Sequence, residues 1–303
     1  MRVKNRVSGK ALEYYLDKPN SLKEWYVASL CIYFFCLPLN VIRVGGLGSL
    51  TRFLAFFPII ISLIFNAKIK ISLSIGWLSF SFFAFCSMAW TISFLDSAQR
   101  VLSDVLLACL LLSGGGFYYD ENDIRKLKNA LINSSRFTAI IMLATMEYRQ
   151  GRFFLGGIIV EDPNYLCAYF IFGAANDIQN ILERIKEKKP ILYFFELLCY
   201  RALIFMSGSR GGAVAVFAGL SVYLFAIMIK SKKVLLRGVI ILIIVIVGIA
   251  FILQKLPDDL RERFTIQNII NSGGSHRIEI WSNGIDLFKK SSVFRKLFGY
   301  GTA

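Results

Sequence analysis

The feature that most constrains this chain is an unbroken apolar run at residues 239–253, which contains no charged side chain. With residues 234–236 leading into it, the run approaches the length of about 20 residues that a helix needs to cross a lipid bilayer. Similar runs recur along the sequence and raise the hydrophobic fraction to 56% and the mean hydropathy to +0.58. Soluble domains are less apolar because their surface must be polar. The sequence therefore predicts an all-α, polytopic transmembrane helix bundle.

Nine membrane-spanning helices are predicted from these runs. They cover residues 25–41, 53–65, 71–92, 101–118, 127–146, 165–182, 191–206, 213–229 and 234–253. Residues 1–24 precede this bundle of residues 25–253, and residues 254–303 form a mixed, polar segment with helical stretches. No internal repeat is visible in the sequence.

Lysine is confined to alternate loops between the predicted spans. These loops carry Lys68 and Lys70, then Lys126 and Lys128, then Lys186, Lys188 and Lys189, then Lys230, Lys232 and Lys233. Lysine-rich loops face the cytoplasm, so the pattern predicts a cytoplasmic N-terminus and an extracytoplasmic segment 254–303. The net charge of +15 follows from these loops, and we expect membrane lipid and no nucleic acid as a partner.

The loops predicted to lie outside carry arginine instead. They contain Arg43, Arg52, Arg100, Arg149, Arg152 and Arg210. Arginine binds phosphate or carboxylate through two parallel hydrogen bonds, which lysine cannot do. The pattern indicates an anionic ligand on the outer face, although arginines at helix ends also extend toward water for purely structural reasons.

Three short motifs place polar residues at helix starts on this outer face. Ser209 and Arg210 open the eighth span, where a helix N-terminus with an added arginine suits a phosphate. Asn164 follows Asp162 and Pro163 at the start of the sixth span, downstream of Arg149 and Arg152. Arg277 follows a Gly/Ser-rich turn and precedes Trp281 on an amphipathic helix of residues 278–288. Each motif also has a simpler interpretation as a helix cap or a tight turn.

Charged residues inside the predicted spans are a further signal. Arg201 and Glu196 lie in the seventh span and Asp104 in the fourth. Such residues are costly in a membrane and face a bundle interior or a water-filled cavity. Arg201 either pairs with Glu196 or Asp104 or lines a substrate path. No CxxC pair or histidine cluster is present, so no metal site is predicted; His276 is the single histidine.

Taken together, these motifs resemble the bacterial O-antigen ligase and O-antigen polymerase superfamily of membrane glycosyltransferases. The matching elements are Asp162-Pro163-Asn164, Ser209-Arg210-Gly211, Arg277 with Trp281, Gly299-Tyr300-Gly301 and, less closely, Ala89-Trp90-Thr91 with Asp96, Ser97 and Arg100. The resemblance covers most of the chain from Trp25 onward. It implies a protein of the bacterial inner membrane whose active face is extracytoplasmic.

The resemblance also implies a reaction. Such enzymes transfer a glycan from undecaprenyl diphosphate to a hydroxyl of an acceptor glycan or glycolipid, without a metal or other cofactor. Arg210 and Arg277 would hold the diphosphate as catalytic residues. Asn164, Asp162, Ser209, Arg152, Arg149 and Trp281 would bind substrate.

One departure from the family pattern concerns the catalytic base. The family's histidine follows the G-x-G element, whereas His276 precedes it and the sequence ends at Ala303. We therefore expect these 303 residues to be C-terminally truncated and unable to catalyse transfer alone.

Two other functions are compatible with the sequence. A transporter or flippase of a lipid-linked or anionic substrate would explain the spans and the outer arginines, but not the long segment after Leu253, and transporters often carry an internal repeat. A structural partner in a polysaccharide assembly complex would tolerate replacement of Arg210 and Arg277.

Overall fold

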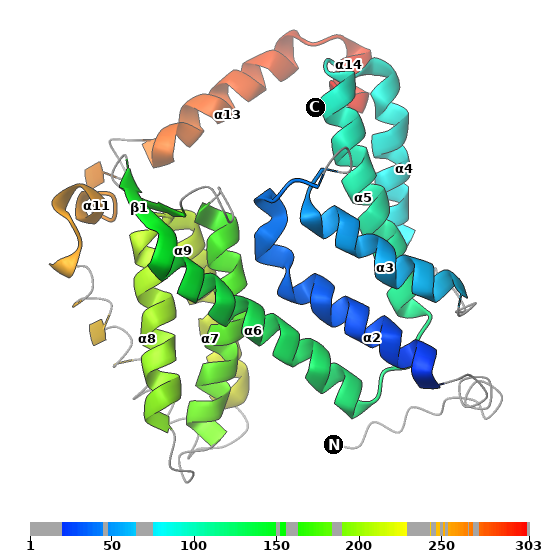
Figure 1. Cartoon of the computed structure of the whole chain (residues 1–303). Coiled ribbons are helices and arrows are strands. Elements are labelled where there is room, and N and C mark those ends of the chain that lie inside the picture. Colours follow the sequence, from blue (N-terminus) through cyan, green and yellow to red (C-terminus); the bar gives the residue numbers. More distant parts are fainter. Residues whose placement is uncertain are drawn as a thin grey trace. The chain divides into compact units, whose positions relative to one another are not determined.

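The computed structural model describes residues 20–44, 48–64, 75–149, 152–155, 163–183, 190–228, 243, 247–248, 251, 254–265, 267–268 and 273–301. Most of these residues are helical, in agreement with the predicted all-α class (Figure 1). The α-helices are α2 (Asn20–Phe35), α3 (Leu50–Ile64), α4 (Ile75–Ser87), α5 (Phe94–Gly115), α6 (Glu121–Thr145), α7 (Pro163–Glu183), α8 (Pro190–Met206), α9 (Arg210–Met228), α11 (Asp258–Glu262), α13 (Gly273–Lys290) and α14 (Val293–Phe298). Two short 3-10 helices, η1 (Leu37–Val41) and η4 (Met88–Trp90), follow α2 and α4.

A β-ribbon lies between α6 and α7, where the sequence had predicted only a loop. Strand β1 (Met146–Arg149) pairs antiparallel with β2 (Arg152–Leu155), and its register places Arg149 opposite Arg152. The ribbon is the one departure from an all-α fold among the described residues.

The chain divides into two compact units. Unit 1 comprises residues 1–34, 44–128 and 298–303, and unit 2 comprises residues 35–43 and 129–297, within the described ranges. In unit 1, α5 packs against α3 and α4. Its core is centred on Tyr26, whose ring stacks on Phe117 with centroids 3.9 Å apart.

Helix α6 begins with two reciprocal hydrogen bonds in unit 1. The backbone N–H of Asp123 donates to Asp120 Oδ1 at 2.8 Å, and the N–H of Asp120 donates to Asp123 Oδ2 at 3.1 Å. This arrangement satisfies two backbone donors at the helix end. Lys23 on α2 forms ion pairs with both carboxylates, at 3.2 Å to Asp120 and 2.6 Å to Asp123.

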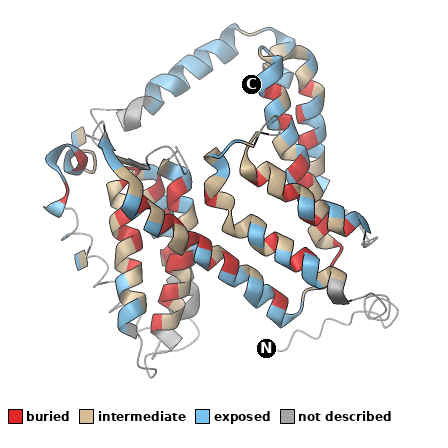
Figure 2. Ribbon diagram, viewed as in Figure 1, coloured by how far each residue is buried: buried red, intermediate tan, exposed pale blue. Residues whose placement is uncertain are grey.

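Unit 2 is built around α7, which packs against both α8 and α9 (Figure 1). Buried positions lie along α6, α7 and α8 (Figure 2), and Phe170, Ile178, Leu197 and Leu203 belong to the core shared by α7 and α8. A Cβ built on Gly173 of α7 would lie 2.7 Å from ring atoms of Tyr200 on α8. The close approach of the two helices therefore requires glycine at position 173.

Several helices coincide with predicted spans, and two others end before the predicted end of their span. The helices α3, α7, α8 and α9 each begin and end within three residues of the bounds of a predicted span. Helix α2 ends at Phe35, six residues before the predicted end of the first span, and the following 3-10 helix contains Pro38, which has no N–H to continue an α-helix. The third span was predicted to reach residue 92, but α4 ends at Ser87 and η4 follows.

No helix among the described residues has the length and apolar composition required to cross a membrane. The nine predicted spans are therefore not confirmed. Most of the ninth, residues 234–253, lies outside the described residues.

Candidate functional site

The N-terminus of α9 is fixed by the side chain of Ser209. Ser209 Oγ accepts a hydrogen bond from the backbone N–H of Gly212 at 2.9 Å, which caps the helix. Upstream, Gly208 adopts a positive φ of 66° where the chain turns from α8 into α9. The turn places Ser209, which is 7% exposed, against the body of unit 2.

The first turn of α7 meets this cap. Ser209 Oγ donates a hydrogen bond of 2.6 Å to Oδ1 of Asn164, which follows Pro163 at the start of α7. Two of the sequence motifs are thus joined by a direct hydrogen bond across 45 residues. Asp162 was also predicted to contribute here, and it lies outside the described residues.

Arg277 on α13, which belongs to the third motif, also lies near the start of α9. A Cβ built on Gly211 would lie 3.5 Å from Asn164 Oδ1 and 3.7 Å from Arg277 Nη2. The guanidinium of Arg277 and the amide of Asn164 therefore both lie beside the first turn of α9. Arg277 and Asn164 are exposed, so both are accessible to a ligand.

Gly212 makes a tighter contact than Gly211. Its built Cβ would lie 2.5 Å from Cys167 Sγ and 2.7 Å from Cys167 Cβ on α7. Helices α7 and α9 approach each other so closely at this point that only glycine fits without displacement. The contact holds the start of α9 next to Asn164.

Arg210 lines a cavity of about 340 Å³ between α8 and α9. The walls include Arg201, Phe205, Val216, Phe217, Leu220 and Phe264. Arg210 Nη1 donates a hydrogen bond of 3.4 Å to the carbonyl oxygen of Arg263, and the ring of Phe264 packs against that of Phe205 with centroids 5.3 Å apart. Phe264 thus forms one side of the cavity, next to the carbonyl group that Arg210 bonds.

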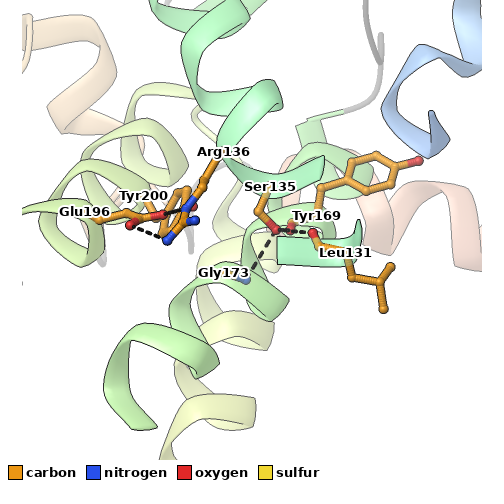
Figure 3. Close-up of polar contacts among 7 residues, drawn as sticks. All are labelled: Leu131, Ser135, Arg136, Tyr169, Gly173, Glu196 and Tyr200. Atoms are coloured by element: carbon orange, nitrogen blue, oxygen red, sulfur yellow. Dashed lines mark hydrogen bonds and ion pairs between the residues drawn. The ribbon is translucent and has the colours of Figure 1, made fainter. Parts of the chain in front are cut away.

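Glu196 does not pair with Arg201, which corrects one alternative drawn from the sequence. Its carboxylate accepts hydrogen bonds from Nε and Nη2 of Arg136 on α6, at 2.6 and 3.1 Å, and from Tyr200 Oη at 2.7 Å (Figure 3). Arg136 was not identified from the sequence. Arg201 is 8% exposed, and its Nε and Nη1 have no hydrogen-bond partner in the part of the chain that the structure describes.

A neighbouring set of contacts fixes α6 against α7. Ser135 Oγ lies 2.5 Å from the carbonyl oxygen of Tyr169 and accepts a 3.2 Å hydrogen bond from the backbone N–H of Gly173 (Figure 3). With the Arg136–Glu196 pair, these bonds connect α6, α7 and α8.

The remaining predicted site residues are not brought into contact with Ser209 or Asn164 by any described interaction. Arg149 and Arg152 form the last pair of the β1–β2 ribbon, as Cα partners. Trp281 lies one turn after Arg277 on α13 and is 63% exposed. His276 lies in the first turn of α13.

Two further motif elements meet in unit 1. A Cβ built on Gly301 would lie 2.7 Å from Thr91 Cα, and the ring of Phe298 packs edge-on against Trp90 with centroids 6.2 Å apart. Gly299 and Gly301 have φ values of 72° and 89°, which favour glycine. The Gly299-Tyr300-Gly301 element thus packs against the Trp90-Thr91 element.

The chemistry available at the α9 site is anion binding. Arginine side chains and a helix N-terminus stabilise phosphate oxygens, and Asn164 adds an amide that bonds hydroxyl or phosphate groups. Within the described residues, no three His, Cys, Asp or Glu side chains gather in a way that could hold a metal ion.

Comparison with known proteins supports the family resemblance. Residues 195–303 match the family model described as O-Antigen ligase, which is consistent with a member of the O-antigen ligase and polymerase superfamily. The match includes Ser209, Arg210, Arg277 and Trp281, and Asn164 lies upstream of it. No curated protein and no solved structure matches the chain. The match supports an O-antigen ligase-type function in surface polysaccharide assembly and a glycosyltransferase-like activity.

Proposed function

Given the O-antigen ligase match over residues 195–303, we propose that this protein is a metal-independent membrane glycosyltransferase of bacterial surface polysaccharide assembly. It transfers a glycan from undecaprenyl diphosphate to a hydroxyl of an acceptor glycan or glycolipid. The observation that carries the proposal is the meeting of three separate motifs at the start of α9, where Ser209 bonds Asn164 and Arg277 lies beside Gly211.

The proposed location is the inner membrane, with the N-terminus in the cytoplasm and the site on the outer side. This part rests on the apolar runs and on the alternation of lysine between loops. An outer site fits a donor whose glycan is presented outside the membrane.

In the proposed reaction, the acceptor hydroxyl oxygen attacks the anomeric carbon of the donor glycan. A new glycosidic C–O bond forms as the bond from that carbon to the diphosphate breaks, and its electron pair leaves with the diphosphate. Arg210 and Arg277 stabilise the charge that develops on this leaving group, while Asn164 and Ser209 position it with Asp162. Arg149, Arg152 and Trp281 bind the glycan on its approach. The proton of the hydroxyl passes to a base outside this set of residues.

The test is the size distribution of surface polysaccharide in a strain that lacks the gene. The strain is complemented with the complete gene or with its Arg210→Ala, Arg277→Ala or Arg261→Ala variant at equal protein levels. Arg261 is the matched control, because it is an exposed arginine of unit 2 that pairs with Asp258 at 2.6 Å. We expect Arg261→Ala to restore long chains and the other two variants to fail.

The glycans that accumulate when the activity is lost distinguish a polymerase from a ligase. Accumulated single repeat units identify a polymerase, and long chains left on the lipid carrier identify a ligase. Full restoration by Arg210→Ala and Arg277→Ala contradicts the proposal and favours a structural partner in the assembly complex, which tolerates these replacements. Unchanged polysaccharide in the strain that lacks the gene favours a transporter, which moves its substrate without forming a glycosidic bond.

A further inference from the structure

Arg201 is a buried cation with two guanidinium nitrogens that lack a partner in the described part of the chain. Its side chain is more than nine-tenths buried, and neither Nε nor Nη1 has a hydrogen-bond partner in the described chain. An arginine stays protonated at any pH a protein meets. A buried charge is strongly unfavourable unless it is paired and hydrogen-bonded, so the position calls for an anion.

The described carboxylates of unit 2 do not supply that anion. Glu196 is committed to Arg136 and Tyr200 through three hydrogen bonds. Asp177 on α7 is fully buried and both of its oxygens also lack a hydrogen-bond partner, so it makes no contact with Arg201. No described side chain therefore supplies the counter-charge, and a bound anion is the source that the cavity beside Arg201 can accept.

The surroundings of Arg201 indicate what kind of molecule fits. Among the described residues that line the cavity of about 340 Å³, Arg201 and Arg210 are charged and the other side chains are apolar, including Ile204, Val216 and Leu220. A small inorganic anion would satisfy the arginines but leave the apolar wall against water. The volume lies at the lower end of the 300–1,000 Å³ that is typical of ligand pockets, which suits the head end of a longer molecule.

We infer that this cavity binds the phosphate end of a phosphorylated lipid, with Arg201 contacting the phosphate and the apolar wall holding the first part of the chain. Arg210, on the same cavity, contacts the same head group from the side of Arg263. The identification of the lipid as the polyprenyl diphosphate of the donor rests on the proposed function. The alternative source of the same chemistry is a membrane phospholipid.

The test measures ligand affinity of the purified protein in neutral detergent. The ligands are farnesyl diphosphate, inorganic pyrophosphate and phosphatidylglycerol, and the variants are Arg201→Met, Arg201→Lys and Arg136→Met. Met keeps an unbranched, apolar stem without the charged guanidinium. Arg136→Met is the control, because it removes an arginine of the same unit that already has a carboxylate partner.

We expect Arg201→Met to weaken binding of farnesyl diphosphate by about 10- to 100-fold, as expected for losing one hydrogen bond to a charged group. Arg136→Met should change this affinity by less than about twofold. A second readout separates a binding role from a structural one. The unliganded Arg201→Met protein should unfold at the same or a higher temperature than the original, because it no longer buries an unpaired charge. If Arg201→Met does not fold, Arg201→Lys provides the measurement, with weaker binding expected because the two-pronged hydrogen bonding is lost.

Each outcome decides the inference. Tighter binding of farnesyl diphosphate than of phosphatidylglycerol supports the donor lipid, and the reverse order supports the site with a membrane phospholipid as its ligand. Equal affinity for pyrophosphate and farnesyl diphosphate overturns the lipid assignment. Unchanged affinity in Arg201→Met overturns the site itself, and it leaves the proposed function standing if Arg210→Ala still abolishes long polysaccharide chains.

Discussion

The contact between Gly212 and Cys167 predicts that two neighbouring glycines respond differently to the same substitution. At Gly212, an added Cβ would lie 2.5 Å from Sγ and 2.7 Å from Cβ of Cys167, and 2.8 Å from Ser209 Oγ. At Gly211, an added Cβ would meet its nearest atoms at 3.5 and 3.7 Å, which is ordinary van der Waals contact. Gly212→Ala should therefore destabilise the protein relative to Gly211→Ala.

The size of the stability difference can be worked out because the two glycines lie in the same helical turn. Both residues lie in the first turn of α9, so the gain in helix propensity, which is at most about 1 kcal/mol, cancels in the comparison. The remaining term is overpacking, which costs about 1–3 kcal/mol. For a chain of this size, 1 kcal/mol shifts the unfolding midpoint by about 2–4 °C. Gly212→Ala should then unfold roughly 2–12 °C below Gly211→Ala.

Thermal unfolding of both variants in the same detergent, followed by tryptophan fluorescence, measures this difference. A double variant adds a check. In a Cys167→Gly background both close atoms of residue 167 are absent and only the contact with Ser209 Oγ remains, so Gly212→Ala should cost less than it does in the original protein. Equal midpoints for Gly211→Ala and Gly212→Ala would show that α7 and α9 are not closely packed at the site.

Three further predictions concern the scaffold around the site. Gly208→Ala should lower the free energy of unfolding by about 1–2 kcal/mol, since φ is 66° there, and chemical denaturation measures it. A double-mutant cycle of Arg136→Met and Glu196→Gln should give a coupling of about 1 kcal/mol, because the 41% exposure of the Arg136 side chain weakens the ion pair; zero coupling would contradict the bond. The N–H of Asp123 and the ammonium of Lys23 hold the pKa of Asp120 below its usual range. The ionised carboxylate of Asp120 therefore stabilises the protein above about pH 4, and this contribution is lost as the pH falls further. The Asp120→Asn variant should consequently lose less stability on acidification than the original protein.

Local sequence signals were sufficient to predict where the site helices begin. Ser209 is a preferred N-cap residue, and it caps α9 through Gly212. Pro163 suits the first position of a helix, and α7 starts there. These signals work because capping depends on residues within a few positions of the helix end. They also placed Asn164 and Arg277 at helix starts, but they carried no information on the distance between those helices.

The β1–β2 ribbon was missed although a signal was present. Only Gln150 and Gly151 separate its strands, and two short runs divided by two residues that include glycine are typical of a β-hairpin. The Arg136–Glu196 pair had no such signal. Its members are 60 residues apart, so the pairing follows from the packing of α6 beside α8 and not from any local pattern.

Arg136 and Arg201 show why site assignment needs the fold. In the sequence both are single arginines within predicted spans, and residue type alone favours neither as a ligand contact. In the fold, Arg136 forms an ion pair with the carboxylate of Glu196, whereas Arg201 faces a cavity that Arg210 also lines. Arg210 and Arg201 are thus held by the packed helices α8 and α9, whereas Arg277 belongs to α13, where every residue from Arg277 to Lys290 is exposed. An anion bound at the start of α9 would consequently meet a fixed side formed by the bundle and a second side formed by α13, so the affinity of the site depends on the position of α13 as well as on the arginines themselves.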